Sequence, residues 1–382
     1  MKVCMVSDQV FPAVGGEGIV TQNLCIRLSQ RGHKVIILTS RVPHPPKIKD
    51  IEVIRFPAFS IPQKGYFATA LWYQISSILK KRKIQIVHVN LPTFLGWQSF
   101  LAARKLDIPR IAGFHVQVGN VIPYDLPPFS FLKKLVELWF SYFYGLADFL
   151  ISPSNLGKKI LSRYLSGKVE VISNGVDLGI FNLDAVSLKE GKRFREKFRL
   201  KDSPFLLYVG RLSREKNVGY LLKIMQILTK KNFPVKLLIV GEGELKVLLQ
   251  KKTFSMSLDK KVIFAGYLPE RELLCAYKEA DIFILPSLFE LQSMVVVEAM
   301  AMGKPILVGR SSQSAACEMI KEGVNGYIFD LRDPLDAAEK VESILSNFSL
   351  KESMQKASLR IARDHDIQIS ISKVEDIYRR LL

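Results

Sequence analysis

No apolar run in this sequence reaches the roughly 18 residues that a membrane-spanning helix requires, although 48% of its 382 residues are hydrophobic. We therefore expect globular domains. Cysteine is also scarce: Cys4, Cys25, Cys275 and Cys317 lie far apart and lack the spacing of metal ligands. Free thiols of this kind fit a reducing cytosol. The first residues form a strand pattern whose apolar run is too short for a signal peptide, so we expect a cytoplasmic protein.

Acidic residues are in deficit. The chain has 36 Asp and Glu against 55 Lys and Arg, a net charge of +19. Residues 1–180 hold 22 basic and 10 acidic residues, so +12 of the excess lies in the N-terminal half. A basic surface suits nucleic acid, an anionic membrane or an anionic substrate, and a general basic bias of the source organism is the alternative. The basic segments lack the aromatic stacking motifs of nucleic-acid-binding proteins, so we expect no nucleic-acid partner.

Strands and helices alternate along both halves of the chain. In the first half, apolar runs predict strands at 2–7, 34–39, 52–56, 85–89, 110–115, 148–152 and 169–172, and helices at 67–81, 95–105, 129–146 and 155–164. After a charged, strand-free stretch at 183–204, in which we interpret residues 200–204 as a linker, strands at 205–210, 235–240, 262–265, 281–285, 305–308 and 326–329 continue the pattern. This α/β alternation predicts two doubly wound parallel domains, 1–183 and 184–366. An amphipathic helix over 367–382 is expected to cross back onto the first domain.

A glycine loop follows the first strand. Gly15 and Gly16 precede a helix that runs to Gln30, and a second strand follows it. The backbone amides of such a loop can bind a phosphate, while glycines of an ordinary tight turn are the alternative. The spacing is not Gly-x-Gly-x-x-Gly, and no acidic residue ends the second strand to hold a ribose. Both absences argue against a nicotinamide-dependent oxidoreductase.

Two glutamates mark the second half of the chain. Glu290 follows a short apolar strand, and Glu298 lies about two turns into the next helix. Parallel sheets bind ligands just beyond the carboxyl ends of their strands, and free amides at a helix N-terminus stabilise an anion there. The amides that would open this helix belong to Ser293, Met294 and Val295. The element predicts an anion site beside two carboxylates; an ordinary amphipathic helix with two solvated glutamates is the alternative.

Three further polar side chains lie near strand ends. His115 ends the strand at 110–115, although a lone histidine is more often structural. Arg211 and Lys216 lie on the loop after the strand at 205–210, a position that favours ligand contact over burial. The one Asp-x-Asp sequence, at 364–366, is interpreted as a loop before the last helix, so no metal site is predicted.

Together these motifs resemble the retaining glycosyltransferases of family 4, enzymes with two Rossmann-like domains that face each other across a cleft, the GT-B architecture. The resemblance covers nearly the whole chain. It rests on Gly15-Gly16, His115, the segments 152–154, 174–177 and 209–212, Lys216-Asn217, and Glu290 and Glu298 eight positions apart. The family often has Phe-Gly-Leu after the first glutamate. This chain has Gln292-Ser293-Met294, which alters the fit of the phosphate site.

The resemblance implies a metal-independent hexosyltransferase without a cofactor, whose UDP- or GDP-linked sugar donor binds mainly to the second domain. Its expected catalytic residues are Glu290, His115, Arg211 and Lys216, and its expected substrate-binding residues are Gly15, Gly16, Ser293, Met294, Val295 and Glu298. The cations and amides would stabilise the leaving diphosphate, Glu298 would hold the ribose, and Glu290 and His115 would contact the donor sugar. No second carboxylate is placed as a nucleophile, so same-face attack assisted by the leaving phosphate is expected.

Aromatic and basic residues gather in the half that carries the +12 excess. The segment 125–144 and the loop 61–67 are rich in aromatics, and Lys80 to Lys83 form a basic cluster. Such surfaces suit an anionic bilayer, and similar segments occur in family members that act on diacylglycerol or phosphatidylinositol. We therefore expect a lipid acceptor and a peripheral location at the inner face of the cell membrane. The alternatives are a buried helix at 129–146, a soluble sugar, polysaccharide or lipopolysaccharide acceptor, or a sugar-nucleotide epimerase or phosphorylase of the same architecture.

Overall fold

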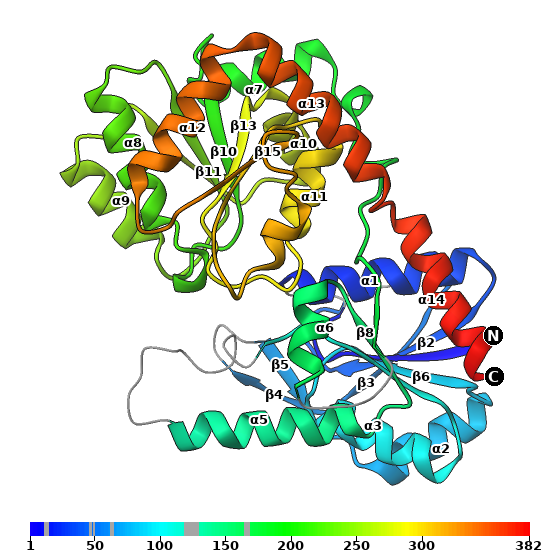
Figure 1. Ribbon diagram of the computed structural model, residues 1–382. Coiled ribbons are helices and arrows are strands. Elements are labelled where there is room, and N and C mark those ends of the chain that lie inside the picture. Colours follow the sequence, from blue (N-terminus) through cyan, green and yellow to red (C-terminus); the bar gives the residue numbers. More distant parts are fainter. Residues whose placement is uncertain (11–14, 46–47, 49, 62–64, 118–129, 164–168) are drawn as a thin grey trace. The chain divides into compact units, whose positions relative to one another are not determined.

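The computed structural model describes residues 1–10, 15–45, 48, 50–61, 65–117, 130–163 and 169–382. The chain forms two compact units (Figure 1): unit 1 comprises 1–174 and 370–382, and unit 2 comprises 175–369. The expected boundary at 183/184 lies nine residues later than this division. The segment that follows residue 174 joins unit 2, where the amide of Val176 donates to the His365 carbonyl at 2.8 Å. Parts of the expected segments 61–67, 125–144 and 155–164 lie outside the described residues.

A parallel seven-stranded sheet forms the centre of unit 1. Its order is β3 (Glu52–Phe56), β2 (Lys34–Ser40), β1 (Lys2–Val6), β6 (Ile86–Val89), β7 (Arg110–Gly113), β8 (Phe149–Ser152) and β9 (Val169–Val171). The inner strands are continuous runs of buried side chains, as expected for a sheet that helices cover on both faces. Because the chain order reverses between β1 and β6, that point is the topological switch point of unit 1.

The described residues up to 174 form five helices of unit 1, and side-chain caps mark the start of two of them. The five are α1 (Gly15–Gln30), α2 (Trp72–Arg82), α3 (Phe94–Lys105), α5 (Ser130–Gly145) and α6 (Asn155–Leu161). Thr93 accepts from the Gly96 amide to cap α3, and Ser154 accepts from the Gly157 amide to cap α6. The helix predicted at 67–81 begins too early, because residues up to Ala68 form an antiparallel hairpin of β4 (Ala58–Ile61) and β5 (Gly65–Ala68).

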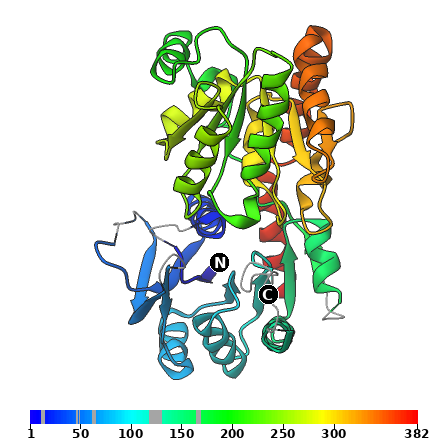
Figure 2. The same ribbon diagram turned by 90° about the vertical axis from the view of Figure 1, so that its left-hand side faces the viewer.

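The last helix, α14 (Ile367–Leu381), returns to unit 1, as the sequence predicts, and both chain ends belong to that unit (Figures 1 and 2). Glu375 pairs with His33 at 2.6 Å and with Arg31 at 2.9 Å. The buried Tyr378 hydroxyl lies 2.8 Å from Nδ1 of His88. These contacts join α14 to the sheet of unit 1.

Unit 2 is built on a second parallel sheet. Its order is β12 (Val262–Gly266), β11 (Lys236–Val240), β10 (Phe205–Val209), β13 (Ile282–Leu285), β14 (Ile306–Gly309) and β15 (Gly326–Phe329). Helices lie on both sides of it (Figure 2): α8 (Gly219–Lys230), α9 (Lys246–Ser255), α10 (Glu270–Glu279), α11 (Met294–Ala301), α12 (Pro334–Ser346) and α13 (Phe348–Arg363). Its switch point lies between β10 and β13.

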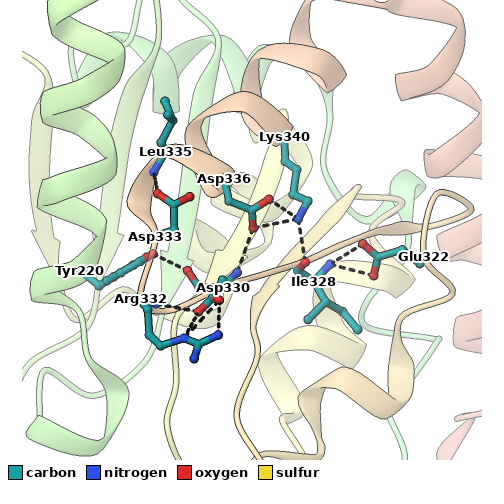
Figure 3. Close-up of polar contacts among 9 residues, drawn as sticks. All are labelled: Tyr220, Glu322, Ile328, Asp330, Arg332, Asp333, Leu335, Asp336 and Lys340. Atoms are coloured by element: carbon teal, nitrogen blue, oxygen red, sulfur yellow. Dashed lines mark hydrogen bonds and ion pairs between the residues drawn. The ribbon is translucent and has the colours of Figure 1, made fainter.

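Two local features of unit 2 were not expected. The charged, strand-free stretch at 183–204 contains α7 (Leu188–Lys197), which begins with a capping box of Ser187 and Glu190 and buries Phe194. At the sheet edge, polar contacts hold the turn between β15 and α12 (Figure 3). There Tyr220 donates to the Asp330 carbonyl at 2.6 Å, and Asp333 caps α12.

Candidate active site

The loops at the switch point of unit 2 pack closely. Gly210 directly follows β10 and Gly241 directly follows β11, and a Cβ on Gly241 would lie 2.0 Å from the Gly210 carbonyl oxygen. Gly241 has φ +133, a conformation that favours glycine. The amide of Leu212 donates to the Glu242 carbonyl at 2.8 Å, so the two loops are also hydrogen-bonded. This packing positions the segment from Arg211 to Lys216 at the carboxyl edge of the sheet.

Lys216 and Glu290 meet across the switch point. Lys216 ends a short 3-10 helix after β10, Glu290 follows β13, and Nζ of Lys216 lies 2.6 Å from Oε1 of Glu290. Their side chains are 19% and 8% exposed. The Leu288 amide donates to the Glu215 carbonyl at 2.8 Å and ties the two loops together. The pair therefore places a cation and a carboxylate where doubly wound sheets bind ligands.

Arg211 lies on the same loop but remains accessible. Its side chain is 59% exposed, and its guanidinium pairs at 3.3 Å with Glu215. Ser213 also donates to this Glu215 carboxylate, at 2.6 Å. An exposed ion pair of this length contributes little to stability, so the guanidinium can exchange its partner for an incoming anion.

Helix α11 begins at Met294, with Ser293 as its N-cap. The amides of Val296 and Val297 donate to the Ser293 carbonyl. The Ser293 hydroxyl is buried and has no hydrogen-bond partner among the described residues. Glu298 lies one turn into the helix rather than two, because the helix starts at Met294.

Glu298 faces Tyr277 of α10, a residue for which the sequence gave no signal. The buried Tyr277 hydroxyl donates to Oε2 of Glu298 at 2.7 Å. Burial of the Glu298 carboxyl raises its pKa to about 7, and the hydrogen bond from Tyr277 opposes that rise. No described cation is paired with this carboxylate, so it accepts hydrogen bonds and does not neutralise a charge.

The site residues expected in the first domain lie in unit 1. Gly15 and Gly16 are the first residues of α1. His115 lies two residues beyond β7, which ends at Gly113 rather than at His115. A Cβ on Gly113 would come within 2.7 Å of Nε2 of His115, so glycine leaves room for the ring. Burial lowers the pKa of His115 to about 4, so the imidazole is neutral at physiological pH.

A buried polar network at the switch point of unit 1 was not predicted. The Thr21 hydroxyl donates to the Glu17 carboxylate at 2.7 Å and accepts from the side-chain amide of Asn90 at 2.6 Å. Ser7 also donates to Glu17, at 3.2 Å. Burial raises the pKa of Glu17 to about 7. The position of Glu17 directly after Gly15-Gly16 was the one signal for this network in the sequence.

Solved structures share the fold of the whole chain and define its class. A sucrose-phosphate synthase from Thermosynechococcus elongatus matches with a TM-score of 0.81 at 19% identity, over 100% of this chain and 98% of that one. HepE from Anabaena, solved with UDP-glucose, matches with a TM-score of 0.80 at 16% identity, over 100% of each chain. The fold is that of GT-B glycosyltransferases, and the predicted fold class is confirmed.

Two family models then match consecutive parts of the chain. The model described as Glycosyltransferase Family 4 covers residues 14–179, and the model described as Glycosyl transferases group 1 covers residues 190–360. The chain therefore consists of a glycosyltransferase family 4 domain followed by a glycosyl transferases group 1 domain, and the predicted resemblance is confirmed.

Relatives with a known activity are similar over most of the chain. The α-monoglucosyldiacylglycerol synthase of Streptococcus pneumoniae is 29% identical over 80% of this chain and 70% of its own length. The sulfoquinovosyl transferase SQD2 of Arabidopsis thaliana is 26% identical over 97% of this chain and 72% of its own. A GDP-mannose-dependent α-mannosyltransferase of Mycolicibacterium smegmatis is 27% identical over 80% of this chain and 79% of its own.

Proposed function

We propose that this glycosyltransferase moves a hexose from a UDP- or GDP-linked donor to a hydroxyl group of a membrane lipid. The transfer would retain the anomeric configuration and need no divalent metal. The observation that carries the donor part is the pairing of Lys216 and Glu290 at the switch point of unit 2. The lipid part is supported by relatives that are named as glucosyldiacylglycerol synthases.

Each residue of the site has a proposed role. Arg211 and Lys216 stabilise the charge that develops on the leaving diphosphate, together with the amides at the start of α11. Glu290 accepts hydrogen bonds from the donor sugar, and Glu298 accepts them from the ribose. His115 binds a sugar hydroxyl through its neutral imidazole, which both donates and accepts. The Gly15-Gly16 amides bind a phosphate group.

In this proposal, metal independence follows from the charges of the protein, and retention follows from attack on the same face of the sugar. Fixed cations and helix amides can stabilise a diphosphate leaving group without a metal. We propose that the leaving phosphate takes the proton of the attacking hydroxyl while that hydroxyl bonds to the anomeric carbon on the same face. The bond from the anomeric carbon to the phosphate oxygen breaks in the same step, and its electron pair leaves with the nucleoside diphosphate.

A membrane contact is supported by helix α5, which is not buried all round. Phe131, Leu135, Leu138 and Tyr142 are exposed and form one stripe, because they are spaced four, three and four residues apart. The opposite face packs into unit 1, where Phe140, Phe143 and Tyr144 are buried. Trp139 flanks the stripe and donates to the Pro92 carbonyl at 2.8 Å. None of the helices in the described part of the chain has the length and hydrophobicity of a membrane span. We propose peripheral binding at the inner face of the cell membrane.

Labelled transfer tests the activity. The purified chain is offered UDP-glucose, UDP-galactose and GDP-mannose, with vesicles that contain diacylglycerol or its glucosyl derivative, or with soluble sugars, in EDTA. We expect an α-linked glycolipid and full activity in EDTA. Transfer to soluble sugars alone would contradict the lipid acceptor, and a strict need for manganese or magnesium would contradict metal independence. Conversion of the donor without any acceptor would favour an epimerase.

Vesicle sedimentation tests the membrane contact separately. Binding should rise with anionic lipid and fall with salt. It should weaken in Lys80→Glu/Lys81→Glu, which reverses charge on α2, and in Leu135→Ser/Leu138→Ser, which removes apolar area from α5. Lys158→Glu/Lys159→Glu, an equal reversal at exposed lysines of α6, is the matched control and should bind more strongly than the α2 variant. Indifference of wild type to anionic lipid would move the acceptor to a soluble sugar.

A further inference from the structure

A pocket of about 540 Å³ opens on unit 2 at a place that the glycosyl-transfer site does not use. We call it the basic pocket. It is lined by Lys197, Phe198, Arg199, Lys236, Asp259, Lys260, Val262 and Ile263. Three of these residues, Phe198, Val262 and Ile263, are apolar, and four of the lining side chains are cationic. Its volume lies in the range of small-molecule sites.

The basic pocket lies at the amino edge of the sheet, whereas the candidate active site lies at the carboxyl edge. Lys236 is the first residue of β11 and Val262 the first of β12. A strand rises about 3.3 Å per residue, so the five residues of β11 place Lys236 about 16 Å from the glycine loop at Gly241. A ligand in the basic pocket would not touch Arg211, Lys216 or Glu290.

The positive charge of this pocket is poorly compensated. Lys197 pairs with Glu272 at 2.7 Å. Arg199, Lys236 and Lys260 form no ion pair among the described residues, and Asp259 is the one acidic side chain of the lining. Lys201 and Lys261 add two more cations close by. Burial, and then repulsion from these two lysines, lowers the pKa of Lys236. A bound anion would relieve this repulsion.

We propose that the basic pocket binds a phosphate-bearing anion. Arg199 offers a planar guanidinium that can bind phosphate oxygens with two hydrogen bonds, while Lys236 and Lys260 add ammonium donors. Lys236 already donates one hydrogen to the Arg199 carbonyl and keeps two others. The apolar lining residues suit the organic part of such an anion. The same phosphate chemistry occurs in a soluble phosphorylated metabolite and in a phospholipid head group.

The test uses the full chain labelled with ¹⁵N and titrated with inorganic pyrophosphate. Amide signals of Lys260, Lys261 and Val262 report the basic pocket, and those of Met294 and Val295 report the donor site. We expect saturable shifts at the pocket, and Lys236→Gln/Lys260→Gln should weaken that binding by about tenfold or more. Arg199→Gln, which changes an exposed side chain, gives the same test without touching the half-buried Lys236. Lys223→Gln/Lys230→Gln on α8 removes the same charge elsewhere and should bind like wild type.

Vesicles separate the two sources of phosphate. Phosphatidylcholine vesicles with and without phosphatidylglycerol are sedimented with the same variants. Pyrophosphate binding that is lost in the pocket variants, with vesicle binding unchanged, assigns the pocket to a soluble anion. Loss of both relative to the α8 control assigns it to a lipid head group. Pocket signals that do not move, or pyrophosphate binding that weakens as much in the α8 control as in the pocket variants, overturn the proposal. Because donor-site signals are followed separately, failure here is distinguishable from failure of the proposed function.

Discussion

The ammonium group of Lys216 lies 2.6 Å from Oε1 of Glu290, a residue 74 positions further along the chain. The strand order explains how they meet, because β10 and β13 are neighbours at the centre of the sheet of unit 2. Glu290 is 8% exposed, so its charge requires a partner. Lys216 therefore has a structural role in addition to the role in phosphate binding that the sequence suggests.

The first prediction separates these two roles. Lys216→Ala should lower kcat about 10²- to 10³-fold, as does the loss of one preorganised charge-stabilising group, and should also destabilise unit 2 by leaving Glu290 unpaired. The double variant Lys216→Ala/Glu290→Gln should regain stability but not activity. Stability is measured by circular dichroism. Tryptophan fluorescence reports unit 1 alone, because Trp72, Trp97 and Trp139 all belong to it.

The exposed pair Lys231–Glu342 gives a matched control for the Lys216 and Glu290 variants. Its Lys231→Ala variant should change stability by less than about 1 kcal/mol and leave kcat unchanged. If Lys216→Ala behaved like Lys231→Ala in both measurements, the assignment of the site would be wrong.

The second prediction concerns Arg211, which lies at the same loop but is mostly exposed. Arg211→Ala should lower kcat by one to several orders of magnitude while the free energy of unfolding changes by less than about 0.5 kcal/mol. Arg214→Ala removes an exposed arginine three residues away and should preserve kcat. Equal losses in both variants would indicate a general charge effect and contradict a specific phosphate contact.

The sequence predicted the strands well because buried parallel strands are short apolar runs whatever their neighbours. It missed the β4–β5 hairpin because Phe67 and Ala68 also fit the start of the helix at Trp72. It gave no helix at α7 because this helix is highly charged and buries little beyond Gly191 and Phe194.

Only those residues of the candidate site that are close together in the sequence could be predicted as neighbours. Glu290 and Glu298 share one strand–loop–helix segment, so their proximity to the start of α11 could be read from spacing. The partners of these glutamates, Lys216 and Tyr277, come from other segments, and their contacts depend on the sheet order and on the packing of α10. Glu17 and Asn90 show the same limit in unit 1, since Thr21 connects them only in the folded chain.

The third prediction is kinetic and concerns Glu298. Glu298→Gln should raise the KM for the donor with a smaller effect on kcat, because a hydrogen bond to a charged acceptor is worth about 1.5–3 kcal/mol. Glu290→Gln should mainly lower kcat. Initial rates over a range of donor concentrations distinguish the two. Wild-type kinetics in both variants would remove the two glutamates from the site.

The fourth prediction follows from the pKa of Glu298, which burial raises from 4.5 to about 7 in the folded chain. A raised carboxyl pKa stabilises the fold below pH 4.5, and this contribution is lost as the pH rises through 7. Glu298→Gln lacks this titration and keeps an acceptor for Tyr277. At pH 8 it should therefore be more stable than wild type by up to about 3 kcal/mol, with little difference at pH 4.5. Circular dichroism melts of unit 2 across this range measure it, and a parallel pH dependence in both proteins would contradict the raised pKa of the buried Glu298.

The last prediction concerns the return of α14 to unit 1. Tyr378→Phe removes the hydroxyl that lies 2.8 Å from Nδ1 of His88. Because Nε2 of His88 is also buried without a partner among the described residues, the variant leaves the whole imidazole unsatisfied. We expect the free energy of unfolding to fall by about 1–3 kcal/mol. Denaturation monitored by tryptophan fluorescence measures this change. Tyr142→Phe, at an exposed tyrosine of α5, is the control and should be neutral.

Burial lowers the pKa of His88 to about 3, so the folded chain binds fewer protons than the unfolded chain below pH 6.5. Unit 1 should therefore lose stability as the pH falls from 6.5. His88→Gln should flatten that acid limb. An unchanged limb in this variant, together with a neutral Tyr378→Phe, would show that α14 is held by Glu375 and apolar packing instead.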